Sequence, residues 1–162
     1  MNNVEWTPEW LAETIKLLRT HGSDTQFIEV KKAHGGYPGS LDATLSSFSN
    51  SSTGGIIICG LDENNDFAPV GVYDPADLEK TLGNKLRRGL KPPNTMESGT
   101  ILYEDAKIFV AAIPPLPPYE RPAYIGGKAY VRSGDGDHEM SRHETDLMVA
   151  QRTRTGFDEE PV

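Results

Sequence analysis

The chain has 162 residues, of which 36% are hydrophobic and 25% charged, the size and composition of a single folded domain. Its formal net charge of −8 argues against a protein that coats nucleic acid through overall positive charge, although it leaves room for a local basic face. The longest apolar run, residues 56–59, is too short to cross a bilayer, and the N-terminus lacks the pattern of a secretion signal. Because the sequence has one cysteine, Cys59, it cannot form an internal disulfide, and we expect a cytoplasmic protein without a membrane partner.

The first half of the sequence alternates between helical and extended patterns. A helix is predicted first, because Thr7 can cap its N-terminus, apolar residues recur every three or four positions, and Gly22 can end it. A strand, a glycine-rich loop and a short helix follow, and then a buried strand with a hairpin partner beyond a polar turn. In chain order these elements are the helix 8–20, the strand 26–32, the loop 34–40, the helix 41–50, and the strands 56–61 and 69–72.

The second half begins with a helix that Asp74 can cap, and it contains two hairpins joined by a stiff polyproline stretch. Ser141 and Glu144 form a capping box that starts the last helix. In chain order the elements are the helix 75–89, the strands 100–104 and 107–113, the polyproline stretch 114–118, the strands 123–125 and 128–132, and a helix from 141 to about 152. Together with the first half they predict an α+β fold, in which three to four helices pack on a mixed β-sheet.

Gly54-Gly55 lies between the predicted short helix and the buried strand. The pair lacks the lysine and the hydroxyl residue of a phosphate-binding P-loop, and it follows a helix instead of preceding one. We interpret it as a helix stop at which two backbone segments approach each other closely.

An ordered series of short motifs runs from residue 24 to about residue 150. An acid and a Glu-x-Lys strand come first, then a Ser-x-x-Asn helix end, two glycines, and an apolar strand that ends in Gly-x-Asp. The residues are Asp24, Glu29-Val30-Lys31, Ser46 to Asn50, Gly54 to Asp62, Gly71, Arg121 to Tyr124, and Tyr130 to Gly134. This order resembles the Schlafen AlbA domain, although that family usually has glutamate in place of Asp24 and one residue fewer between Asn50 and Gly54.

The resemblance implies an N-terminal helical extension (1–23), a Schlafen AlbA-like domain (24–152), and a tail or the start of a truncated following region (153–162). It implies a regulatory domain that binds nucleic acid, DNA rather than RNA, within a larger ATP-binding, transcriptional-regulator-like protein. ATP would bind in the C-terminal region beyond this fragment, and the fragment itself would need no cofactor. Two alternatives remain, an RNA endonuclease that depends on Mg²⁺ or Mn²⁺, and a module for protein interaction or for homodimerisation.

The endonuclease alternative depends on a set of acids. Glu29 and Lys31 lie two apart on a strand and therefore project from one face, where the acid can hold a metal ion and the lysine can steady a phosphate. By resemblance the catalytic residues would be Asp24, Glu29, Lys31 and Asp62, and the metal ligands Asp24, Glu29, Asp62 and Asp66. The alternative interpretation is a surface ion pair for Glu29 and ordinary turn chemistry for Asp62 and Asp66.

The binding hypothesis depends on one basic cluster in the predicted helix 75–89 and just beyond it. No acid interrupts residues 80–91, and the basic side chains share one side of the helix while leucines occupy another. Arg132, next to a glycine-rich loop, is a further candidate for phosphate contact. The predicted nucleic-acid-binding residues are Lys80, Lys85, Arg87, Arg88, Lys91 and Arg132. The alternative is a solvated helix face whose cations complement the helix dipole.

Overall fold

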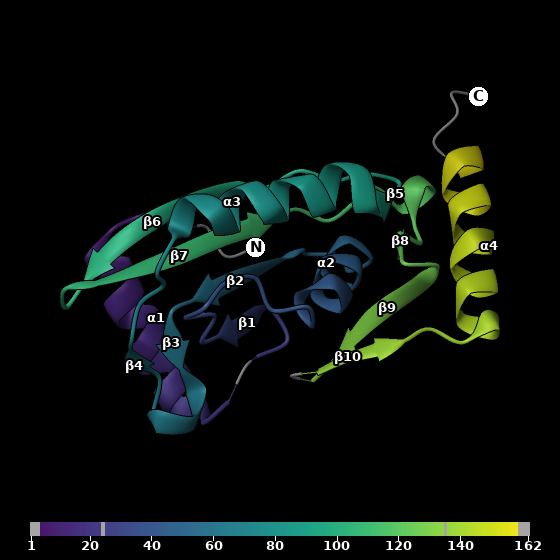
Figure 1. Ribbon diagram of the computed structural model, residues 1–162. Coiled ribbons are helices and arrows are strands. Elements are labelled where there is room, and N and C mark those ends of the chain that lie inside the picture. The colour runs from purple at the N-terminus through teal and green to yellow at the C-terminus, as the bar shows by residue number, and fades with distance from the viewer. Residues whose placement is uncertain (1–3, 24, 135, 159–162) are drawn as a thin grey trace.

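The computed structural model describes residues 4–23, 25–134 and 136–158, and these form an α+β fold as predicted (Figure 1). The first sheet has the strand order β1-β2-β7-β6; β1 and β2 are parallel and the remaining pairs antiparallel, so this sheet is mixed. The second sheet, β10-β9-β8-β5, is antiparallel throughout. The strands are β1 (Ile28–Lys31), β2 (Gly55–Cys59), β3 (Leu61–Asp62), β4 (Ala68–Pro69), β5 (Leu90–Lys91), β6 (Glu97–Tyr103), β7 (Ala106–Ile113), β8 (Tyr124–Ile125), β9 (Lys128–Ser133) and β10 (Gly136–Glu139).

Helices cover both faces of the first sheet, and its central strand β2 is therefore buried on both sides. Ile57 and Cys59 pack in one apolar cluster with α2 and α3, whereas Ile56 and Ile58 pack in a second cluster with α1. Alternate residues of a strand point to opposite faces, which explains this division. The helices are α1 (Pro8–His21), α2 (Leu41–Ser49), α3 (Pro75–Asn84) and α4 (Arg142–Asp158), with shorter turns η1 (Glu63–Asn65), η2 (Lys85–Gly89) and η3 (Pro118–Glu120).

The predicted helix ends are confirmed where a local cap defines them. The Thr7 hydroxyl accepts a hydrogen bond from the backbone N–H of Trp10 at 3.1 Å, and Gly22 ends α1 in the left-handed conformation. Ser141 and Glu144 form the reciprocal capping box of α4. Both predicted hairpins of the second half are also present, as β6-β7 and β8-β9.

Several predicted boundaries are wrong, including the start of β6, which lies at Glu97 instead of Thr100. The strand predicted over 26–32 covers only 28–31, because the Thr25 hydroxyl accepts hydrogen bonds from the N–H groups of Phe27 and Ile28 and holds a turn there. The helix predicted over 75–89 ends at Asn84 and continues as the π-helical turn η2. The predicted hairpin after residue 56 is limited to the short pair β3-β4, and α4 runs to Asp158 instead of about Arg152. Neither β5 nor β10 was predicted.

The close approach predicted at Gly54-Gly55 is confirmed, but the pair is not the helix stop, because α2 already ends at Ser49. Gly54 has a φ of +73°, and a Cβ atom added there would lie 2.1 Å from the carbonyl oxygen of Ile113. A Cβ atom on Gly55 would lie 2.5 Å from the ring of Phe48. Only glycine therefore fits between α2 and the first sheet at these two positions.

Cys59 should resist thiol reagents in the folded protein. The thiol is fully buried in β2, and burial raises its pKa to about 12. Because the thiolate is the reactive form, we expect negligible labelling by a maleimide or a disulfide reagent at pH 8 until the chain unfolds. Labelling followed by mass spectrometry, with urea-unfolded protein as the positive control, measures this; equal rates in both samples would contradict the buried position.

Candidate nucleic-acid interface

The basic cluster lies where α3 continues into η2. Leu82, Leu86 and Leu90 point into the core and are each at most 1% exposed. The cations on the other side of this segment are open to solvent, so the two-sided pattern of the sequence is present in the fold. We call these exposed cations the basic face; they are Lys80, Arg87, Arg88 and Lys91.

Unlike several other cations in the described part of the chain, the cations of the basic face have no carboxylate partner. Among the described residues, no ion pair joins it to an acid. The cations that do have carboxylate partners are Arg19, Lys31, Lys32, Lys85, Lys128 and Arg132. A local positive surface therefore exists despite the net charge of −8.

Lys85 belongs to the predicted cluster but is held by its neighbours. Its Nζ lies 3.1 Å from a carboxylate oxygen of Asp42 and 5.6 Å from the centre of the Tyr37 ring. The Tyr37 hydroxyl donates to the other oxygen of Asp42, and burial together with this hydrogen bond raises the pKa of Tyr37. Lys85 is thus fixed in position and partly neutralised at the edge of the basic face.

A shallow depression of about 360 Å³ lies between Lys85 and the basic face. Its lining is rich in hydrogen-bond donors, namely the side chains of Thr81, Asn84, Lys85 and Arg88 next to Gly89. Hydroxyl, amide and cationic donors of this kind contact phosphate oxygens in nucleic-acid complexes.

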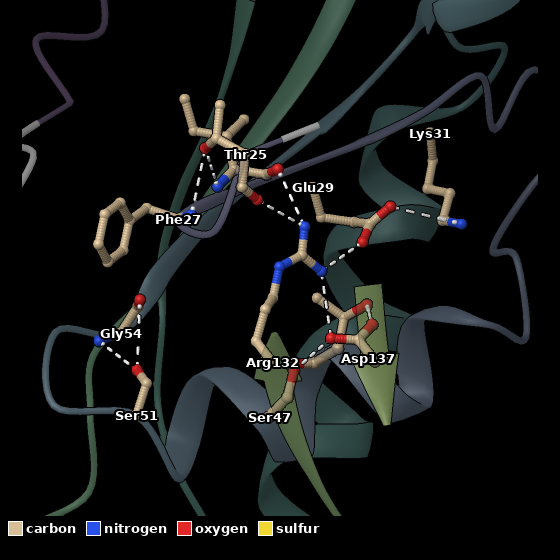
Figure 2. A network of polar contacts seen from close by, with 11 residues as sticks. Thr25, Phe27, Glu29, Lys31, Ser47, Ser51, Gly54, Arg132 and Asp137 are labelled. Atoms are coloured by element: carbon tan, nitrogen blue, oxygen red, sulfur yellow. Dashed lines mark hydrogen bonds and ion pairs between the residues drawn. The ribbon is translucent and has the colours of Figure 1, made fainter. Parts of the chain in front are cut away.

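Arg132 lies away from this face, in a buried ion network (Figure 2). Its side chain is only 2% exposed, and Nη1 lies 2.6 Å from Glu29 and 3.1 Å from Asp137. Its Nη2 donates to the backbone carbonyls of Thr25 and Ile28 at 2.9 and 3.1 Å. Burial opposes the charged guanidinium, but the hydrogen bonds and charges of Glu29 and Asp137 outweigh it and raise the pKa of Arg132. This burial keeps Arg132 from joining the basic face.

Asp137 is the member of the network that sequence reasoning missed. It pairs with Arg132 across the β9-β10 hairpin, and it also accepts hydrogen bonds from the hydroxyls of Thr44 and Ser47 on α2. The sequence feature that could have indicated this pair is the glycine-rich segment 133–136. A hairpin centred there makes residues 132 and 137 direct neighbours.

The predicted Glu29–Lys31 pair is present on one face of β1, with Nζ and Oε2 3.5 Å apart. It is not a simple surface ion pair, because the Glu29 side chain is 7% exposed and its other oxygen binds Arg132. Both carboxylate oxygens of Glu29 are thus engaged by cations of the protein.

The remaining predicted acids lie apart from Glu29. Asp62 caps η1 and lies 3.8 Å from Lys32, and Asp66 follows η1 and pairs with Arg19. Asp24 lies outside the described residues. Within the part of the chain that the structure describes, no three acids, histidines or cysteines are grouped so that they could hold a metal ion.

Ser46 and Asn50 connect α2 to the second sheet. The Ser46 hydroxyl accepts from the N–H of Tyr130, and the Asn50 amide bonds to the backbone of both Ala123 and Tyr130. The two side chains, four positions apart, thus both face the second sheet from the end of α2. Their role is to hold the second sheet against α2.

Residues 24–141 match the protein family described as Schlafen, AlbA_2. The fold is similar to a solution structure of the N-terminal domain of a putative ATP-dependent DNA helicase RecG-related protein from Nitrosomonas europaea, with a TM-score of 0.61 and 23% identity over 81% of this chain and 94% of that chain. It is also similar to the DIP2311 protein of Corynebacterium diphtheriae, with a TM-score of 0.58 and 15% identity over 88% of this chain and 32% of that one. No curated protein matches the sequence. Among the described helices, none is both long and apolar enough to cross a membrane.

Proposed function

We propose that this chain, which belongs to the Schlafen AlbA_2 family, is a DNA-binding domain whose basic face contacts the phosphate backbone. The observation that carries the proposal is the group of four exposed cations that run from the middle of α3 through η2 to β5 and have no carboxylate partner among the described residues. Charges of this kind release counterions when they meet phosphates, and that release drives sequence-independent binding.

The surroundings of the basic face support a backbone contact. The depression beside it offers hydroxyl, amide and cationic donors, and η2 is a π-helical turn, a feature that is frequent at functional sites. The acids of the same helix, Asp77 and Glu79, lie in its first half. Negative charge therefore lies toward the start of α3, and positive charge lies toward its end and beyond it. A polyanion would thus be attracted to the C-terminal end of α3 and repelled from the start.

We place the domain inside a larger regulatory protein. This chain spans about a third of the Corynebacterium diphtheriae chain that shares its fold. The Nitrosomonas europaea protein is named as related to an ATP-dependent DNA helicase. Both facts support a domain that brings DNA to an ATP-dependent activity in another part of a larger protein. We propose that the domain regulates that activity.

The proposal predicts that reversing charge on the basic face weakens DNA binding. The variant Arg87→Glu/Arg88→Glu should lower the affinity for a labelled duplex at low salt, as measured by fluorescence anisotropy. The slope of log K against log salt should shrink by about 2, because each phosphate contact contributes roughly 0.9. The matched control is Lys16→Glu/Lys107→Glu, which changes the net charge equally at two exposed sites on α1 and β7. Equal loss in both variants, or none in the first, would rule out the basic face.

The same samples distinguish binding from cleavage. We propose binding without cutting, because both oxygens of Glu29 are engaged by cations and, among the described residues, no three acids, histidines or cysteines are grouped so that they could hold a metal ion. Incubation of the duplex and of a structured RNA with Mn²⁺, or with a chelator, followed by a denaturing gel, tests this. Cutting that a chelator stops, and that Glu29→Gln abolishes, would instead support the metal-dependent ribonuclease.

A further inference from the structure

One donor of the buried ion network has no acceptor among the described residues. Nη1 and Nη2 of Arg132 are fully engaged, but its Nε is buried and makes no hydrogen bond. Buried donors are rarely left without an acceptor in folded proteins. Figure 2 shows this atom on the side of the guanidinium that faces Phe27 and the Ser51–Gly54 turn, away from Glu29 and Asp137.

A cavity of about 260 Å³ lies on that side of Arg132. Part of its wall is the turn that carries Gln26 and Phe27, and the Phe27 ring is 39% exposed. Another part is the end of α2 and the turn that follows it, with the hydroxyls of residues 51–53. The cavity thus combines an aromatic surface and several small polar groups with the side chain of Arg132, whose Nε–H is buried and has no acceptor among the described residues.

The charges around the cavity favour a neutral ligand. The positive charges of Arg132 and Lys31 are already balanced by Glu29 and Asp137. The C-terminal end of α2 faces the same space, and the backbone carbonyls at a helix C-terminus disfavour an anion. An uncharged acceptor such as a carbonyl oxygen therefore suits the free Nε–H better than a phosphate or a carboxylate does.

From these observations we infer that the cavity receives one unpaired nucleobase, an inference that rests on the proposed nucleic-acid function. A carbonyl oxygen of the base accepts from Arg132 Nε, and the base plane stacks against Phe27. The hydroxyls of Ser52 and Thr53 and the Gln26 amide lie at the rim, where they can contact the edge of the base. Because Nε is buried, the base reaches it when the exposed Phe27 side chain and the 51–53 turn move apart, while Nη2 stays bonded to the carbonyls of Thr25 and Ile28. The domain would then bind a single-stranded or extruded nucleotide in addition to the backbone.

A phosphate-free probe tests this site separately from the basic face. The Nε–H signal of Arg132, assigned in a ¹⁵N-labelled sample, is followed by NMR while uridine or cytidine is added at millimolar concentration. We expect a saturable shift of this signal, and weaker binding by roughly tenfold in Phe27→Ala because base stacking is lost. Tyr119→Ala is the matched control, since Tyr119 is also an exposed aromatic residue but lies outside the cavity.

Three other outcomes of this experiment would overturn the inference. If neither nucleoside moves the Nε–H signal, or if Phe27→Ala and Tyr119→Ala have equal effects, the cavity is not a base site. If inorganic phosphate moves the signal and the nucleosides do not, the cavity is an anion site. The variant Arg87→Glu/Arg88→Glu should leave nucleoside binding unchanged, so failure of the base site and failure of the basic face are distinguishable.

Discussion

Replacing Arg132 with methionine should lower the free energy of unfolding by about 3–5 kcal/mol near neutral pH, because two buried carboxylates lose the cation they share and Glu29 keeps only its more distant partner Lys31. Glu29 and Asp137 are only 7% and 11% exposed, so water cannot replace the guanidinium. The variant also loses the two hydrogen bonds that hold the carbonyls of Thr25 and Ile28. Methionine retains most of the side-chain volume, which limits the contribution of an empty cavity. Urea unfolding followed by circular dichroism measures the change.

Two further variants test whether the loss comes from unpaired charge. Arg19→Met removes a cation whose side chain is 44% exposed and whose partner Asp66 is 78% exposed, so it should cost no more than about 1 kcal/mol. Glu29→Met combined with Arg132→Met should be less destabilised than the sum of the two single variants, because one unpaired carboxylate is gone. A cost for Arg132→Met similar to that of Arg19→Met would show that the network contributes little to stability.

Features that depend on residues close together in the sequence could be predicted. Features that depend on residues far apart in the sequence were missed. Thr7 and the Ser141–Glu144 box bond to N–H groups three residues away, so their residue types predict the helix starts. The α+β class was equally predictable, because alternation and helical periodicity are local patterns. In contrast, Arg132 and Glu29 are 103 positions apart, and no local pattern indicates that they meet.

The candidate site shows the same division. The basic face was predictable because Lys80 to Lys91 is a continuous acid-free segment with leucines on its other side. The sequence did not predict that Lys85 pairs with an acid instead of joining that face, because this pairing depends on Asp42 and Tyr37 from a different part of the chain. The proposed acid site depended on how β1 and β3 are placed in space, which a motif three residues long cannot define. The assignment of Glu29 to a buried ion network required the register of the second sheet.

Asn50 is a second position where one buried side chain joins distant parts of the chain, here the end of α2 and the second sheet. Its Oδ1 accepts from the N–H of Ala123 at 2.7 Å, and its Nδ2 donates to the carbonyls of Tyr130 and Ala123 at 3.0 and 3.3 Å. Ala123 is fully buried, so its backbone groups have no access to water. An amide supplies a donor and an acceptor on one planar group, and this position uses both.

The variant Asn50→Ala should therefore lower the free energy of unfolding by about 2–4 kcal/mol, because buried backbone groups of Ala123 and Tyr130 lose their partners. Asn50→Asp should be no milder, since its second oxygen would face two carbonyl oxygens where the amide now donates. The control Asn64→Ala alters an exposed residue of η1 and should change stability by less than about 0.5 kcal/mol. Hydrogen exchange adds a local readout: amides of β8 and β9 should lose protection before those of β2 and β7. Uniform loss across both sheets would show that the second sheet does not depend on Asn50 for its attachment.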